Sequence, residues 1–276
     1  MLHAPSDRQP AVAGRFYPGS PSALAEEVAA LLAERPQGRP TPEPPLPALG
    51  VLAPHAGYMY SGRVAGATYA RVDVPERVIV LGPNHTGMGE RVALWPAGAW
   101  HTPIGRVPLD ADLNRDLVAS GLVREDREAH RLEHALEVQL PFLQLRRPEV
   151  AIAAVCLGPL PFARCRELGV AVAGAARRHG ALVVASSDMS HYLPAPVARR
   201  KDEQALERVL ALDPEGLYEV VQREDISMCG FVPATVMLVA AKELGAREAE
   251  LVRYGNSAEA SGDESSVVGY AGVVVR

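Results

Sequence analysis

Short apolar runs recur along the chain, and each is bounded by glycine, proline or a polar turn segment. Residues 77–82 and 181–186 are clear examples, because they are rich in valine and do not alternate with charged residues. Continuous runs of this length are typical of parallel strands buried on both faces of a sheet. The pattern predicts strands over residues 49–53, 77–82, 91–95, 150–157, 181–186, 249–254 and 267–275.

Helical spacing separates most of these runs. The segment that follows Ser20 has Leu24, Val28 and Leu31 on one face, so it should form an amphipathic helix that begins at Pro21. Alternation of strands and helices indicates βαβ units, and therefore a mainly parallel or mixed sheet with helices on both faces. Helices are predicted over residues 21–34, 60–71, 131–146, 161–179, 198–211, 214–223 and 231–244.

A proline-rich segment over residues 36–47 connects the first helix to the first of the alternating strands. Its repeated prolines exclude a helix and favour an extended strap on the surface. The helix over residues 21–34 is too short to have a core of its own. We therefore expect helix and strap to pack on a single α/β domain that spans residues 1–276.

Composition and charge exclude several classes of function. A formal net charge of −5 and the absence of a basic patch argue against a nucleic-acid partner. No apolar run is long enough to span a bilayer, and residues 1–14 lack the apolar core of a signal peptide. Three cysteines cannot all pair, so a reducing cytoplasm is the predicted location.

Two histidines follow directly after predicted strands. His55 comes after Pro54 at the end of strand 49–53, and His85 comes after Gly-Pro-Asn at the end of strand 77–82. Ligands of open α/β sheets bind at this rim of the strands. Imidazoles bind Zn, Cu, Fe and Ni alike, so the two residues predict part of a metal site. A third protein ligand is required to complete it. The alternative is that each histidine only caps a turn or the next helix.

Cys229 is the strongest candidate for the third ligand. It lies immediately before the predicted helix 231–244, and a helix N-terminus lowers the pKa of a thiol and favours the thiolate that binds metals. Cys156 falls inside an apolar strand, where a buried hydrophobic role is expected. Cys165 lies in a helix among arginines and has no comparable setting.

A third strand end carries both a carboxylate and an imidazole. Asp188 and His191 follow strand 181–186, where they could act as a general acid/base with an orienting partner, or as an outer clamp on metal ligands. Equally, Asp188 could cap a turn with His191 incidentally nearby. Glu133 and Glu137 share a face at the start of the helix 131–146, so one or both could point toward the pocket, but we favour their interpretation as partners of the helix dipole.

These motifs together resemble the Memo family, which in prokaryotes is also labelled AmmeMemoRadiSam system protein B. The resemblance implies a fold like that of the class III extradiol ring-cleaving dioxygenases, a three-layer α/β/α sandwich whose active members hold Fe(II) with two histidines and a glutamate. It rests on ordered segments that span nearly the whole chain, at residues 13–18, 53–58, 82–85, 186–191, 229–230, 262–263 and 266–270.

By motif position, the resemblance assigns His55 and His85 to the two histidine ligands and Cys229 to the place of the carboxylate. It assigns the acid/base role to His191, with Asp188 beside it. The cysteine departs from the dioxygenase pattern, because a thiolate softens the site and widens the choice of metal to Zn, Cu or Fe. This change weakens any prediction of ring cleavage.

The leading hypothesis is therefore an oxidoreductase that uses one transition-metal ion, iron or copper in preference to zinc. Phe16, Tyr60 and Asn84 are predicted to contact a small-molecule or peptide ligand in the cleft. Two alternatives stay open, a non-catalytic module that binds a peptide or another anionic ligand, and a Zn-dependent hydrolase. The prokaryotic family label also associates the protein with a radical-SAM partner.

Overall fold

Four parallel strands form the centre of the sheet in the computed structural model, which describes residues 7–34 and 44–276. They lie in the order β2 (Gly50–Ala53), β10 (Leu182–Ser186), β4 (Arg77–Pro83) and β9 (Ala151–Leu157). Nearly every residue of these strands is buried, as their continuous apolar sequences require when helices cover both faces of a sheet.

Antiparallel strands extend the sheet on both sides, so it is mixed. β13 (Val267–Val275) pairs with β2, and β12 (Ala249–Asn256) and β11 (His191–Leu193) pair with β13. On the other side, β5 (Val92–Leu94) runs antiparallel to β9 and carries β8 (Arg124–Glu125). Two small sheets pair β1 (Leu46–Pro47) with β3 (Val72–Asp73), and β6 (Ala99–Thr102) with β7 (Gly105–Pro108).

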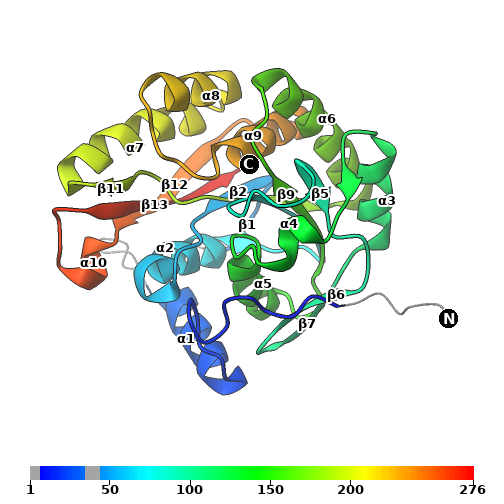
Figure 1. The fold of residues 1–276 in the computed structure, drawn as a ribbon, viewed down its shortest axis with the longest axis horizontal. Coiled ribbons are helices and arrows are strands. Elements are labelled where there is room, and N and C mark those ends of the chain that lie inside the picture. The colour runs from blue at the N-terminus through cyan, green and yellow to red at the C-terminus, as the bar shows by residue number, and fades with distance from the viewer. Residues whose placement is uncertain (1–6, 35–43) are drawn as a thin grey trace.

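Helices cover both faces and complete a three-layer α/β/α sandwich, as Figure 1 shows. Alternate side chains of β4 divide between the two layers: Ile79 and Leu81 belong to one hydrophobic core, and Val78 and Val80 to the other. The first core is covered by α6 (Phe162–His179), α8 (Pro214–Arg223) and α9 (Phe231–Leu244), and the second by α1 (Pro21–Ala33), α2 (Tyr58–Ala70) and α5 (Leu140–Arg146). The other helices are α3 (Ala111–Ala119), α4 (Glu128–Arg131), η1 (Glu137–Gln139), α7 (Ala195–Leu210) and α10 (Ala258–Ser261).

The predicted helix over residues 131–146 is wrong in its first part. Residues 132–136 form an irregular segment between α4 and η1, because the Glu133 side chain accepts a hydrogen bond from the backbone N–H of Ala135 in place of a helical carbonyl. The predicted strap over residues 36–47 lies mostly outside the described residues. Its end forms β1, which pairs with β3.

The carboxyl ends of the central parallel strands meet at one rim, which positions the candidate site. β2, β4 and β10 end two residues before His55, His85 and Asp188, respectively. β4 and β10 are directly paired, and so are β10 and β2. Among the described residues, no helix is both long and apolar enough to cross a membrane.

Candidate metal centre

His55, His85 and Cys229 come together at this rim although they are distant in the sequence. One ligand atom of each residue lies within 4.8 Å of the corresponding atoms of the other two. His55 is almost fully buried, Cys229 is half-buried and His85 is exposed. The two imidazole rings meet edge to face with their centroids 5.2 Å apart.

A buried hydrogen-bond network fixes the tautomer of His55. The Ser186 hydroxyl donates to the carbonyl of Ala135 at 2.7 Å, which uses its only proton. The same hydroxyl accepts from Nε2 of Gln139 at 2.7 Å, and that nitrogen also donates to the Pro54 carbonyl at 3.0 Å. His55 Nδ1 lies 2.8 Å from the hydroxyl and must therefore be the donor. Its Nε2 is left with a free lone pair, as a metal ligand requires.

Glu133 fixes the second imidazole in the same way. Its carboxylate accepts from His85 Nδ1 at 2.9 Å and from the His85 backbone N–H at 2.6 Å. Although burial raises the pKa of Glu133, the hydrogen bond from His85 and the charge of that imidazole outweigh it and lower the pKa to about 2. An ionised carboxylate on Nδ1–H is a frequent outer partner of metal-binding histidines. When the ring is neutral, its proton is on Nδ1, and Nε2 is then the nitrogen available to a metal.

Cys229 completes the cluster. Its Sγ lies 3.2 Å from His55 Nε2 and accepts a hydrogen bond from the Asp188 backbone N–H at 3.3 Å. Gly230 donates to the Ser187 hydroxyl at 2.9 Å, which holds the start of α9 against the β10 loop. Burial, followed by the nearby Asp188 carboxyl, raises the pKa of the Cys229 thiol. The prediction that the helix N-terminus lowers this pKa is thus wrong for the metal-free protein, because burial is the larger effect.

The donor set fits a transition metal. Tetrahedral coordination with the usual metal–sulfur and metal–nitrogen bond lengths separates sulfur from nitrogen by about 3.6 Å, close to the 3.2 Å between Cys229 and His55. A second group of His85, Glu133 and His134 also has its ligand atoms close together. Both oxygens of the Glu133 carboxylate already accept hydrogen bonds from N–H donors, so neither is free of competition as a metal ligand. The first group is therefore the better ligand set.

Asp188 and His191 do not form the pair that the sequence suggested. Oδ1 of Asp188 accepts from the backbone N–H of His55 at 2.7 Å, so this side chain clamps the loop that carries a candidate ligand. Burial raises the pKa of Asp188. His191 is oriented instead by Ser227, whose carbonyl lies 2.9 Å from Nδ1. A carbonyl can only accept, so the proton of neutral His191 is on Nδ1 and its Nε2 is free.

A cleft of about 430 Å³ lies next to the cluster, and its lining includes Asp188 and His134 but none of the three candidate ligands. Phe16, Tyr60 and His191 line it. Asn84 does not, because its side chain is used within its own loop, where it donates to the Met88 carbonyl and accepts from the Gly87 N–H. The other lining residues are Ala56, Gly57, Tyr192, Ser257, Ser261, Asp263, Ser266, Val268 and Tyr270.

The cleft is aromatic and carries no basic side chain among the described residues that line it, apart from its two histidines. Tyr192 is 77% exposed and has a φ of 58°, a left-handed conformation that is costly for a bulky residue. Tyr192 lies next to His191 in the lining of the cleft. The two lining carboxyl groups, Asp188 and Asp263, give the cleft an acidic character.

His134 is the site residue to which the sequence assigned no role. Its ring stacks on His85 with centroids 4.8 Å apart and lies 4.8 Å from the ring of Phe16. Burial, followed by the charge of His55, lowers the pKa of His134 to about 4, so it is neutral at physiological pH. The adjacent Glu133-His134 pair was the available signal, but the expected helix concealed it.

A family model described as "Memo-like protein" matches residues 8–274. A MEMO1 family protein of Methanopyrus kandleri is 43% identical over 280 residues, which cover 98% of this chain and 99% of that protein. A MEMO1 family protein of Aquifex aeolicus is 40% identical, with 97% and 98% covered. The crystal structure of an uncharacterized protein from Escherichia coli K12 superposes with a TM-score of 0.56 at 16% identity, over 82% of this chain and 98% of that one, which is a likeness of fold alone.

Proposed function

The chain belongs to the Memo family, and from this premise we propose that His55, His85 and Cys229 bind one transition-metal ion and that the protein is a metal-dependent oxidoreductase. Iron and copper are preferred to zinc. The single observation that carries the proposal is the convergence of two imidazole nitrogens with free lone pairs and one thiol beside a cleft. Thiolate with imidazole is a donor set that suits Cu, Fe and Zn.

When bound, such an ion would exchange electrons with a substrate or an oxidant at its open coordination positions. The residues of the chain supply the remaining functions. Ser186 and Glu133 hold the two imidazoles in the required tautomers, and Asp188 holds the loop of His55. His191, which presents Nε2 to the cleft region, accepts or returns a proton on the ligand.

The lining of the cleft supports a neutral or cationic small molecule as the ligand. Tyr60, Tyr192 and Tyr270 offer aromatic surface, and Asp263 is an exposed carboxylate whose pKa is lowered by hydrogen bonds from Ser265. Phosphate and carboxylate groups are usually recognised by arginine or lysine, and the described lining contains neither. This composition disfavours the alternative of a module for anionic peptides.

The proposal is tested by metal analysis of protein purified without oxygen, then loaded with Fe(II) or Cu(I). We expect one equivalent of metal in the wild type, and loss of that metal in Cys229→Ala and His85→Ala. Cys165→Ala is the matched control, because that thiol is buried in α6 and belongs to no candidate ligand group. Oxygen consumption or reduction of the bound metal on addition of electron donors measures the redox step.

Protein that carries no stoichiometric metal and gains none on loading would contradict the metal site. Protein that retains only zinc and exchanges it for neither iron nor copper would contradict the redox function and favour hydrolysis instead. Retention of metal by Cys229→Ala would exclude the thiol as a ligand. Folding of each variant is checked by circular dichroism, so that loss of metal can be separated from loss of structure.

A further inference from the structure

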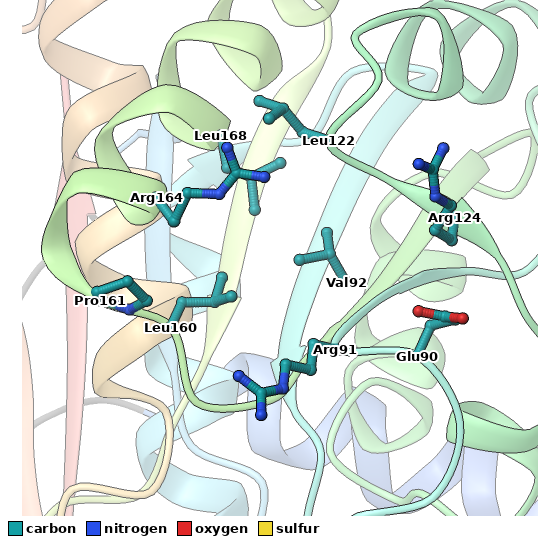
Figure 2. A pocket seen from close by; sticks show the side chains of 9 residues that line it. All are labelled: Glu90, Arg91, Val92, Leu122, Arg124, Leu160, Pro161, Arg164 and Leu168. Carbon is teal, nitrogen blue, oxygen red and sulfur yellow. The ribbon is translucent and has the colours of Figure 1, made fainter.

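A second concave site lies away from the metal centre, where β5 and β8 meet the start of α6. Its volume is about 270 Å³, slightly below the range of about 300–1,000 Å³ that is usual for small-molecule sites. Val92, Leu122, Leu160 and Leu168 form its apolar floor, as Figure 2 shows. None of its lining residues lines the cleft or belongs to the His55, His85 and Cys229 cluster.

Arginines surround this apolar floor. Figure 2 shows Arg91, Arg124 and Arg164 around the aliphatic side chains, each from a different segment of the chain. Within residues 7–34 and 44–276, neither Arg91 nor Arg124 forms a salt bridge, whereas Arg164 pairs with Glu167 at 2.5 Å. Glu90 is the one acidic residue of the lining. Two unpaired cations are thus concentrated at one place on a protein whose net charge is −5.

The start of α6 adds to the positive potential. Pro161 precedes this 18-residue helix and lines the concavity, and the first helical turn contains no acidic side chain. The N-terminus of a helix carries a partial positive charge that favours anions. The concavity therefore combines three features, an aliphatic floor, unpaired arginines and a helix start.

From this combination we infer that the concavity, which we call the arginine site, binds a small aliphatic anion. The aliphatic chain of the ligand lies on Val92, Leu160 and Leu168, and its carboxylate or phosphate group pairs with one guanidinium at the edge of this floor, that of Arg91 or that of Arg124. Guanidinium groups are matched to both anions, because they donate two parallel hydrogen bonds. Four aliphatic side chains and no aromatic one favour a short alkyl chain over an aromatic ring. The inference does not depend on the proposed metal chemistry.

Isothermal titration calorimetry with octanoate and octyl phosphate tests this inference on the full chain. Octanol supplies the chain without the charge, and inorganic phosphate the charge without the chain. We expect both amphiphilic anions to bind more tightly than either control, and more weakly as salt is raised. The better of the two anions identifies the preferred head group.

Variants of the arginine site test where the anion binds. The double variant Arg91→Gln, Arg124→Gln should weaken binding by up to about fivefold, because it removes the arginine that pairs with the head group and an exposed ion pair contributes up to about fivefold in affinity. Arg223→Gln is the matched control, because Arg223 is an exposed arginine of α8 outside the arginine site. Cys229→Ala, which disrupts the metal centre, should leave the binding unchanged.

Three results would overturn the inference. Equal affinity of the double variant and the wild type would exclude the arginines, and octanol that binds as tightly as octanoate would leave only an apolar groove. Loss of octanoate binding in Cys229→Ala would place the anion in the cleft instead. Absence of binding to the wild type by either anion would refute the arginine site outright.

Discussion

Replacement of Glu133 by glutamine should weaken metal binding at the cluster while the fold is retained. The Glu133 carboxylate accepts three hydrogen bonds, from Nδ1 of His85 at 2.9 Å, from the His85 backbone at 2.6 Å and from the Ala135 backbone at 2.9 Å. A glutamine has nearly the same shape but one acceptor oxygen and an amide that donates. At least one buried N–H must then face another donor, and His85 loses the anion that polarises its ring.

The pKa of Glu133 gives the scale of the expected loss of metal affinity. Burial raises the pKa of Glu133, but the hydrogen bond from His85 outweighs it, and the pKa falls from 4.5 to about 2. This difference corresponds to roughly 3 kcal/mol of net preference for the ionised carboxylate, which remains after the cost of burial has been offset by His85 and the other partners. Loss of an outer partner usually reduces metal affinity by about 10- to 100-fold, or roughly 1.4 to 2.7 kcal/mol. The expected loss is therefore smaller than this net preference.

The affinity is measured by competition with a chromophoric chelator for Fe(II) or Cu(I) under anaerobic conditions, and the stability by urea unfolding of the metal-free protein. Glu203→Gln is the control, because Glu203 is an exposed carboxylate of α7 that pairs only with Arg199. A Glu133→Gln variant that binds metal as tightly as the wild type would refute the role of this carboxylate. A variant that fails to fold can be replaced by Glu133→Asp, which retains the charge but shortens the reach to His85.

Three further predictions concern the surroundings of the site. Ser186→Ala removes the acceptor of His55 Nδ1–H and should lower the free energy of unfolding by about 1–3 kcal/mol in urea titrations, with weaker metal binding; an unchanged affinity would contradict the tautomer argument. Gly230→Ala should abolish metal binding, because a Cβ at this position would lie 2.2 Å from the Ser186 carbonyl oxygen. Gly174→Ala in α6 is the control, because its Cβ would only contact the Arg178 guanidinium at 3.5 Å. This control should leave the stability unchanged or raise it by about 0.5–1 kcal/mol in thermal unfolding. Burial lowers the pKa of His130 to about 4, so below about pH 6.5 this histidine binds a proton in the unfolded chain but not in the folded protein. His130 alone should therefore reduce the free energy of unfolding by about 2 kcal/mol between pH 6.5 and 5. His130→Phe should make the free energy of unfolding less dependent on pH in this range.

The central strands were predictable because they are buried on both faces, which leaves a continuous apolar run in the sequence. Their order, β2, β10, β4 and β9, is set by long-range pairing that leaves no local signal. The hairpin of β6 and β7 was missed for a different reason. Its strands are four residues each and mix buried with half-exposed side chains, so neither the parallel nor the alternating pattern is clear.

The candidate ligands could be found from sequence because His55, His85 and Cys229 stand at element ends, where short-range signals are strong. The groups that form hydrogen bonds to the histidines of the site could not be predicted from the sequence. The bond that orients His191 comes from Ser227, 36 positions away, and the carboxylate that orients His85 is 48 positions away. Glu133 can accept the hydrogen bond from His85 only because α4 ends at Arg131 and the next residues are not helical. The helix propensity of the local sequence does not predict this interruption.

The two parts of the site differ in burial. Every group that orients the imidazoles, namely Ser186, Gln139 and Glu133, is fully buried, so the donor geometry is established when the protein folds. Under the proposed function, a metal would bind without reorganisation of the groups that orient its ligands, which favours affinity. The rim is different, because Tyr60 and Tyr192 are 38% and 77% exposed. On the same proposal, substitutions at the rim should change the choice of organic ligand without disturbing the buried groups.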